Sequence, residues 1–269
     1  MKLVTKVVST AATAALCAVS VFAASGPHFV VTNDDVAGSN TATFYTISSS
    51  GSLKQKKVVS TGGTGLGGGY FATARVGVLH DKSQSCVYIS DAASSDVAGI
   101  VVSSLKVAGT FKGSSTDSGN LDGIGLAMND NYLYAGFTAS NTIGTFKVLS
   151  GCKLKFVGDT PASGLNGGAV DGMKIHGNLM VVAYGDGSIE SFNIANGKAK
   201  SNNDKADSTG FASGDYPAGV DITKDGKYAI FGDIPTQSTT AVVVEVANIS
   251  GGNLKKKTKV YRGHILQLE

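Results

Sequence analysis

The stretch NDNYLYAGFTASNTIGTFKV (129–148) has the composition of a β-hairpin. An Asn/Asp turn precedes the apolar run Tyr132–Phe137, a polar loop follows it, and a second run rich in β-branched and aromatic residues covers Thr142–Leu149. Turn residues placed between two runs of strand-like composition are the sequence signal of paired antiparallel strands. The stretch therefore predicts two neighbouring strands of one sheet.

The same arrangement recurs about every fifty residues along the chain. Each copy contains an apolar segment that closes on a small polar or acidic turn: Phe29–Asp34, Cys86–Asp91, Tyr132–Phe137, Val181–Asp186 and Tyr228–Asp233. A repeat of this length made only of short strands is typical of a β-propeller with one four-stranded antiparallel sheet, or blade, per repeat. The sequence predicts an all-β propeller with about five recognisable repeats, near residues 28–69, 70–121, 122–169, 170–217 and 218–269.

The first repeat is predicted to begin at the second strand of its blade, since strand-like sequence starts soon after His28. We label the strands of a blade a to d from the innermost outward. The missing a strand has a candidate at the other end of the chain, His264–Leu268. Two interpretations stay open: a closed five-bladed ring, and a chain that lacks blades of a longer propeller. The short connection Arg262–Gly263 before the candidate strand favours the second.

Residues 1–25 are predicted to be a secretory signal peptide. Lys2 and Lys6 precede the apolar run Val7–Ala24, and small residues offer cleavage after Ala23 or Ser25. A membrane anchor is the alternative, because the run is near spanning length. The remaining residues 26–269 form one predicted propeller domain, which we expect to be secreted or periplasmic without membrane insertion after cleavage.

The net charge and the cysteines bear on which partners, crosslinks and metal sites can be expected. The formal net charge is +3, and loss of Lys2 and Lys6 lowers it to about +1, so no electrostatic argument favours nucleic acid. Cys86 and Cys152 remain after cleavage and are predicted to form a disulfide, with two buried free thiols as the alternative. No His/Cys spacing indicates a metal site, and no cofactor is expected.

The strand order assigns every connection to one of two faces. The a–b and c–d turns share the face that we call the turn face, and the b–c loops and d–a links share the loop face. The loop face is the predicted binding face, because loops gathered on a rigid scaffold usually carry function. Arg75, Asp122 and Asp171 are placed at the mouth of the central channel there. Ion pairing among these three is the alternative to ligand binding.

Four further aspartates lie on the loop face at the ends of b strands: Asp34, Asp91, Asp186 and Asp233. Aspartate caps turns by bonding nearby backbone N–H groups, and a repeat protein would reuse that device in each copy. We therefore predict a turn-stabilising role for these residues more readily than a ligand-binding one.

The hairpin pattern of 129–148 and of KDGKYAIFGD (224–233) resembles the YVTN/lactonase-like β-propeller family. The resemblance implies a propeller of usually seven blades and an enzyme that acts on a small lactone, either a hydrolase or a muconate cycloisomerase. Such enzymes are expected to carry His, Arg and acidic groups around the channel. Here His80 and His176 fall in predicted a–b turns on the opposite face, and no catalytic Ser/His/Asp set is found.

Three functions therefore stay open at this point, and with them whether the protein is an enzyme. A secreted module that binds an unknown small molecule or protein is favoured. A lactonase-like hydrolase or muconate cycloisomerase, and a structural cell-surface protein, are the alternatives.

Overall fold

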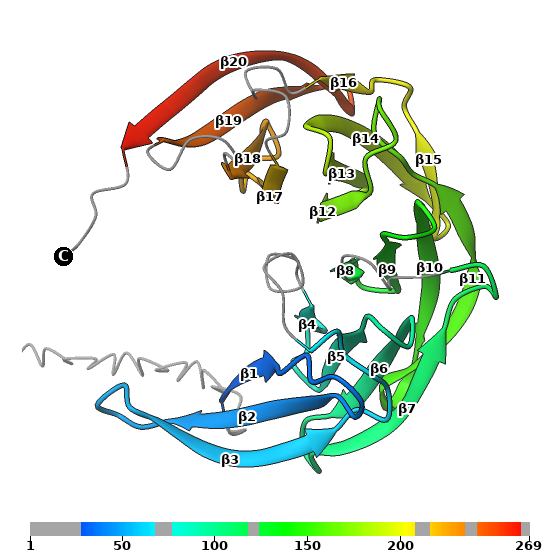
Figure 1. The fold of residues 1–269 in the computed structure, drawn as a ribbon, viewed down its shortest axis with the longest axis vertical. Helices are drawn as coiled ribbons and strands as arrows, with labels where there is room; N and C mark the ends of the chain where they lie inside the picture. Colours follow the sequence, from blue (N-terminus) through cyan, green and yellow to red (C-terminus); the bar gives the residue numbers. More distant parts are fainter. Residues whose placement is uncertain (1–27, 68–76, 118–123, 208–215, 235–240, 265–269) are drawn as a thin grey trace, which may run out of the picture.

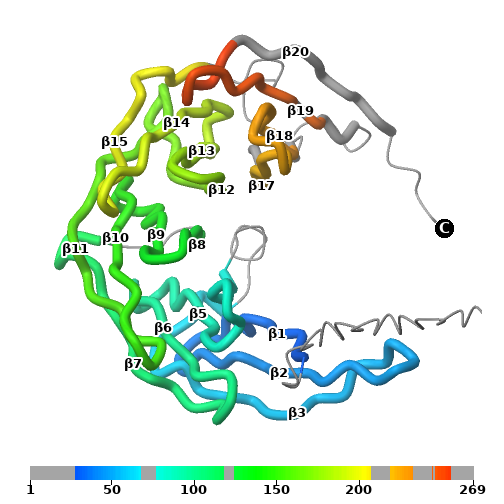
Figure 2. Tube along the Cα trace, turned by 180° about the vertical axis from the view of Figure 1, so that it is seen from behind, coloured from blue at the N-terminus to red at the C-terminus, as the bar shows by residue number. Residues whose placement is uncertain are grey.

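The computed structural model describes residues 28–67, 77–117, 124–207, 216–234 and 241–264. Five antiparallel sheets stand radially around a common centre, so that each sheet is one blade (Figure 1). Strands β8, β12 and β17 lie near the centre, and β7, β11, β15 and β20 lie at the rim, as the view from behind also shows (Figure 2). The predicted all-β propeller is confirmed.

The strands follow one another from the inside of each blade outward. In the first three blades they are β1 (Phe29–Asn33), β2 (Thr41–Ile47) and β3 (Leu53–Ser60); β4 (Val78–His80), β5 (Cys86–Asp91), β6 (Asp96–Val101) and β7 (Lys106–Lys112); and β8 (Ile124–Met128), β9 (Tyr132–Phe137), β10 (Thr142–Leu149) and β11 (Lys153–Pro161).

In the last two blades the strands are β12 (Val170–His176), β13 (Leu179–Tyr184), β14 (Ser188–Ala195), β15 (Lys198–Ser201) and β16 (Ala206–Asp207); and β17 (Tyr216–Ile222), β18 (Tyr228–Ile234), β19 (Ala241–Ser250) and β20 (Asn253–His264). A 3-10 turn, η1 (Ser150–Cys152), precedes β11. No helix in these described parts is long and apolar enough to cross a bilayer.

The core consists of apolar layers between neighbouring blades. Successive residues of a strand point to opposite faces of the sheet, so one strand serves two layers. Tyr88 packs in the layer toward blade three, whereas its neighbour Ile89 packs in the layer toward blade one. Val181 and Val182 divide in the same way between blades five and three. This double coverage explains why the b strands are continuous apolar runs rather than alternating ones.

The blades form an open arc. Blade one contains only β1, β2 and β3, and a gap separates it from blade five (Figure 1). The predicted start of blade one at its b strand is therefore confirmed within the described residues. The proposed closing strand is wrong at its first residue, because His264 pairs with Ala241 as the end of β20. The rest of that segment, 265–268, and the predicted signal peptide lie outside the described residues.

The predicted disulfide is confirmed. Cys86 at the start of β5 is bonded to Cys152 in the turn before β11, with their Cα atoms 5.3 Å apart. The bond joins blades two and three on the turn face. The backbones are close beside it, since a side chain at Gly99 would overlap the carbonyl oxygen of Cys152.

Candidate functional site

The loop face carries the predicted site residues that can be placed. Asp34, Asp91, Asp171 and Asp186 all lie within the described chain. Arg75 and Asp122 lie outside it. Asp233 lies in β18 and pairs through its backbone with Pro217 and Val243, but its side chain is outside the description.

Asp171 lies on β12, the innermost strand of blade four, at a break in the strand register. Val170 pairs with Tyr184 and Gly172 pairs with Ala183, so Asp171 is the extra residue of a β-bulge. The sequence placed Asp171 at the entrance to this strand, whereas the structure places it inside the strand. Bulges redirect side chains and occur often beside active sites. The Asp171 residue is only 3% exposed, so the bulge holds a buried carboxyl group near the centre of the arc.

The same bulge recurs in the next blade without the carboxyl group. In β17 the register shifts between Pro217 and Gly219, which makes Ala218 the extra residue. The two inner strands lie close together here, because a Cβ on Gly172 would stand 3.3 Å from the backbone nitrogen of Val220. Of these two described bulges, only the one in blade four has an acidic extra residue.

Asp186 organises a turn. Its carboxylate accepts hydrogen bonds from the backbone N–H groups of Asn166 (2.7 Å) and Gly168 (3.1 Å) and from the hydroxyl of Ser188. Burial disfavours the ionised form, but the bonds from Ser188, Asn166 and Gly168 outweigh it and hold the pKa of Asp186 below its usual range. The bond from Ser188 is local, as the predicted turn role requires, whereas Asn166 and Gly168 lie 20 and 18 residues away in the link before β12.

Asp34 is similarly engaged. Its two carboxylate oxygens accept the hydroxyl groups of Thr32 (2.8 Å), Thr41 (2.7 Å) and Thr43 (2.7 Å). These threonines flank the β1–β2 connection, so the contacts of Asp34 also fit a local structural role.

Asp91 differs, because it connects two blades and faces a second acid. Its Oδ1 accepts hydrogen bonds from Asn40 Nδ2 and Thr61 Oγ1 of blade one, both at 2.7 Å. Across the β5–β6 hairpin it is paired with Asp96, which is also buried. Burial raises the pKa of Asp91 to about 7, opposed by Asn40 and Thr61 and reinforced by Asp96. Sequence reasoning missed Asp96, although the two acids bracket the turn in DAASSD (91–96).

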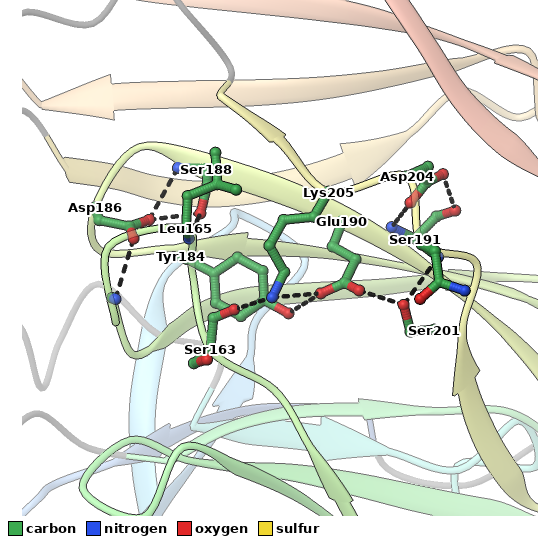
Figure 3. Close-up of polar contacts among 12 residues, drawn as sticks. Ser163, Leu165, Tyr184, Asp186, Ser188, Glu190, Ser191, Ser201, Asp204 and Lys205 are labelled. Atoms are coloured by element: carbon green, nitrogen blue, oxygen red, sulfur yellow. Dashed lines mark hydrogen bonds and ion pairs between the residues drawn. The ribbon is translucent and has the colours of Figure 1, made fainter.

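A second buried polar cluster lies inside blade four (Figure 3). The Tyr184 hydroxyl donates to Glu190 Oε2 at 2.7 Å, and Lys205 Nζ lies 3.5 Å from the same oxygen. The Lys205 ammonium also donates to the carbonyl of Ser163 and lies 5.5 Å from the centre of the Tyr184 ring. Burial and then Glu190 raise the pKa of Tyr184. Since each of these groups bonds another protein group, we interpret the cluster as a structural connection rather than a reaction centre.

The described residues supply no metal centre, since none of their His, Cys, Asp and Glu side chains gather in groups of three or more that could hold an ion. The acidic side chains placed above on the loop face are all aspartates, and Asp171 is the one that lies on an innermost strand.

Comparison with known proteins gives a fold. No protein-family model matches the chain, and no curated protein matches it in sequence. Among solved structures, it is similar to a candidate 6-phosphogluconolactonase of Bacteroides fragilis, with a TM-score of 0.61, 12% identity and coverage of 87% of this chain and 67% of the other. A periplasmic gluconolactonase of Pseudomonas aeruginosa matches with a TM-score of 0.57, 14% identity and coverage of 87% and 68%. By fold, the chain is similar to these lactonase-like β-propellers.

A protein of Lactobacillus plantarum matches with a TM-score of 0.62 at 13% identity, over 86% of this chain and 67% of the other. The chain thus spans about two thirds of the length of all three structures. At this level of identity the likeness is one of fold alone.

Proposed function

We propose that this protein is an extracytoplasmic β-propeller that hydrolyses a small sugar lactone at the loop face. The observation that carries the proposal is Asp171, a buried carboxyl group at a bulge on an innermost strand. The gluconolactonase among the structural neighbours supports the substrate class. The disulfide supports an oxidising compartment, where such bonds persist.

The proposed chemistry assigns one role to each charge at the channel mouth. The Asp171 carboxylate takes a proton from water while the water oxygen attacks the lactone carbonyl carbon. The negative charge that develops on the carbonyl oxygen needs a cation or N–H donor, and Arg75 is the proposed donor. Cleavage of the bond to the ring oxygen, which takes up a proton, then yields the open-chain hydroxy acid. Asp122 is proposed to orient substrate hydroxyl groups.

The test is titration of the acid released from glucono-1,5-lactone and from 6-phosphogluconolactone by the purified full chain. Asp171→Asn is expected to lower kcat/KM by about a hundredfold or more, the usual contribution of a positioned base. Asp130→Asn, on the turn face, is the matched control and should leave the rate unchanged. Release of acid at the spontaneous rate with both lactones would overturn the proposal.

Ligand binding without turnover is the second candidate. It is favoured by the placement of His80 and His176 at the ends of β4 and β12, on the turn face, and by the engagement of Asp34 and Asp186 in bonds within the protein. Calorimetry with gluconate distinguishes the two functions. Binding that Asp171→Asn abolishes, with no acid release from either lactone, would support the binding module.

A further inference from the structure

Two grooves adjoin on the turn face, away from Asp171. The first has a volume of about 410 Å³ and lies between the turn 129–131 of blade three and Gly177 and Asn178 of blade four. The second, of about 330 Å³, lies between Asn178 and Asn193 of blade four and the turn 251–253 of blade five. Asn178 borders both grooves, so that they lie side by side across three blades, and we call the two together the track. Both volumes lie within the usual range of small-ligand sites.

Asparagine dominates the lining of this track, and turn geometry explains only part of it. Asn129 Oδ1 accepts the N–H groups of Asn131 (3.1 Å) and Tyr132 (2.9 Å), as turn asparagines do. Asn193 has no such reason, because it lies within β14, between Leu179 and Lys200, where asparagine is disfavoured. The side-chain amides of Asn178 and Asn193 bond no group in the described part of the chain. Their donors and acceptors are therefore open to a ligand.

Asn202 provides a fixed amide at the far end of the track. Its Nδ2 donates to Ser191 Oγ at 2.8 Å and to the carbonyl of Gly252 in blade five at 3.0 Å. These bonds hold the side chain in one position, and no described donor uses its Oδ1. A group fixed before binding loses less conformational entropy when the ligand arrives.

The remaining lining indicates the class of ligand. No lysine or arginine is among the described residues that line the grooves, and the one aspartate, Asp130, is paired with Lys82 at 3.6 Å. Half-buried Met128, Ile175 and Leu179 add apolar surface. His176 also lines the second groove, and its Nε2 lies 3.2 Å from the carbonyl oxygen of Lys224. Amides that both donate and accept, beside apolar patches and without lysine or arginine, fit a neutral ligand rich in hydroxyl groups that has apolar C–H faces.

We propose that the track on the turn face binds a neutral oligosaccharide, with Asn178, Asn193 and Asn202 bonding its hydroxyl groups. This site lies on the opposite face from the proposed lactone site and is independent of it. A chain of sugar units suits the track better than a single sugar, because the two grooves meet at Asn178 and continue from blade three to blade five.

The test is calorimetric titration of the full chain with maltohexaose, cellohexaose and mannohexaose, with an acidic galacturonate hexamer as the comparison. We expect at least one neutral saccharide to bind. The double substitution Asn178→Ala/Asn193→Ala should weaken its affinity by about tenfold or more. Both residues are exposed, so the melting temperature should stay unchanged. Asn166→Ala, on the loop face, is the matched control and should bind like the unsubstituted protein.

Three outcomes overturn the proposal. They are the absence of binding to every neutral saccharide, stronger binding of the acidic hexamer, and binding that the double substitution leaves intact. Lactone turnover measured on the same variants separates the two sites, because the double substitution should not change it whether or not the lactone proposal holds.

Discussion

At the scale of single residues, Asp91 and Asp96 form a buried acid pair at the end of the β5–β6 hairpin. Both residues are at most 3% exposed, and the neighbouring Asp96 carboxylate disfavours the ionisation of Asp91. Burial raises the pKa of Asp96 as well, although Asp91, Ser94 and Lys112 oppose this. The pair therefore retains a proton up to near-neutral pH. Because Asn40 and Thr61 also bond Asp91, the protonation state affects the contact between blades one and two.

We predict that Asp91→Asn stabilises the protein by an amount that grows with pH. The pKa of Asp91 is about 7 in the folded protein and about 4 in the unfolded chain. Between these values the folded state binds more protons, so its free energy of unfolding falls as pH rises. Asparagine carries no such charge and can still accept the bonds from blade one. Urea unfolding should show the gain rising from about pH 4 to about pH 7 and then levelling.

Asp130→Asn serves as the control for this prediction. Its exposed pair with Lys82 should contribute little to stability at any pH. Acids such as Asp186, whose pKa is lowered, change their contribution only below about pH 4, outside the measured interval. A gain that is constant with pH, or that shrinks as pH rises, would contradict the prediction.

The sequence predicts part of this chemistry. Asp186 follows the expected pattern in its bonds with Ser188, two residues further along the chain. Its bonds with the N–H groups of Asn166 and Gly168 come from the link before β12, 20 and 18 residues away. Asp91 was predicted in the same role, but its partners Asn40 and Thr61 come from another blade. Nothing local in the sequence indicates which blade surface an acid will meet. The same limit applies to Asp171, because a bulge depends on the register between β12 and β13 rather than on residue type alone.

At the scale of strands, the segment between β15 and β16 connects blade four to both of its neighbours, and Figure 3 shows its residues Asp204 and Lys205. Asp204 accepts hydrogen bonds from the N–H groups of Ser191 (2.8 Å) and of Leu254 in blade five (2.7 Å). Lys205 instead pairs with Glu190 and reaches Ser163 in the link from blade three. Side-chain bonds thus replace the regular ladder where the outer strand of blade four is interrupted.

We predict that Lys205→Ala lowers the free energy of unfolding by about 2 kcal/mol, because it leaves the buried Glu190 carboxylate without its cation. The value lies below that of a fully buried pair because the Lys205 side chain is 28% exposed. Adding Glu190→Gln should restore part of the loss by removing the unpaired charge. Urea unfolding of the single and double variants measures both effects. Lys198→Ala, on the exposed side of β15, should change nothing, and a double variant less stable than Lys205→Ala would refute this reasoning.

The disulfide also connects two neighbouring blades, here through a covalent bond. Cys86 and Cys152 are 66 positions apart in the sequence, so the bond constrains a long loop of the unfolded chain. We predict that Cys86→Ala/Cys152→Ala lowers the free energy of unfolding by about 4 kcal/mol. Reductant should destabilise the unsubstituted protein and leave the double variant unaffected. Equal stability of the two proteins under oxidising conditions would show that the bond constrains little.

Strands could be predicted where local composition determines them. The bounds of β9 and β10 agree with the sequence prediction, because each is an apolar run between turn residues. The outer strand of blade four could not be placed as well, since KAKSNNDKAD (198–207) is nearly all polar. There β15 and β16 are determined by pairing with β14, and this contact cannot be predicted from the residues of the segment itself.

At the scale of the whole molecule, the arc has an open flank at blade one. Val59 packs in the layer toward blade two, so its neighbour Val58 points toward the open side. Val58 is 45% exposed. Ile47 and Leu53, which pair with each other across β2 and β3, are also exposed. In addition, β1 lies at the edge of its sheet, with no described strand on its inner side. An apolar surface beside a free strand edge favours association with another protein surface.

We predict that the isolated protein self-associates as its concentration rises and that Val58→Lys weakens this association. A lysine at position 58 would place a charge in the interface, and the cost of burying it opposes contact. Lysine also protects free sheet edges in natural proteins. Sedimentation velocity over a range of protein concentrations measures the effect. Leu165→Lys is the matched control, because Leu165 is similarly exposed at 52% but lies in the link between blades three and four, away from the open flank. A protein that stays monomeric at all concentrations, or an equal effect of both substitutions, would show that the flank of blade one is not the surface through which the molecules meet.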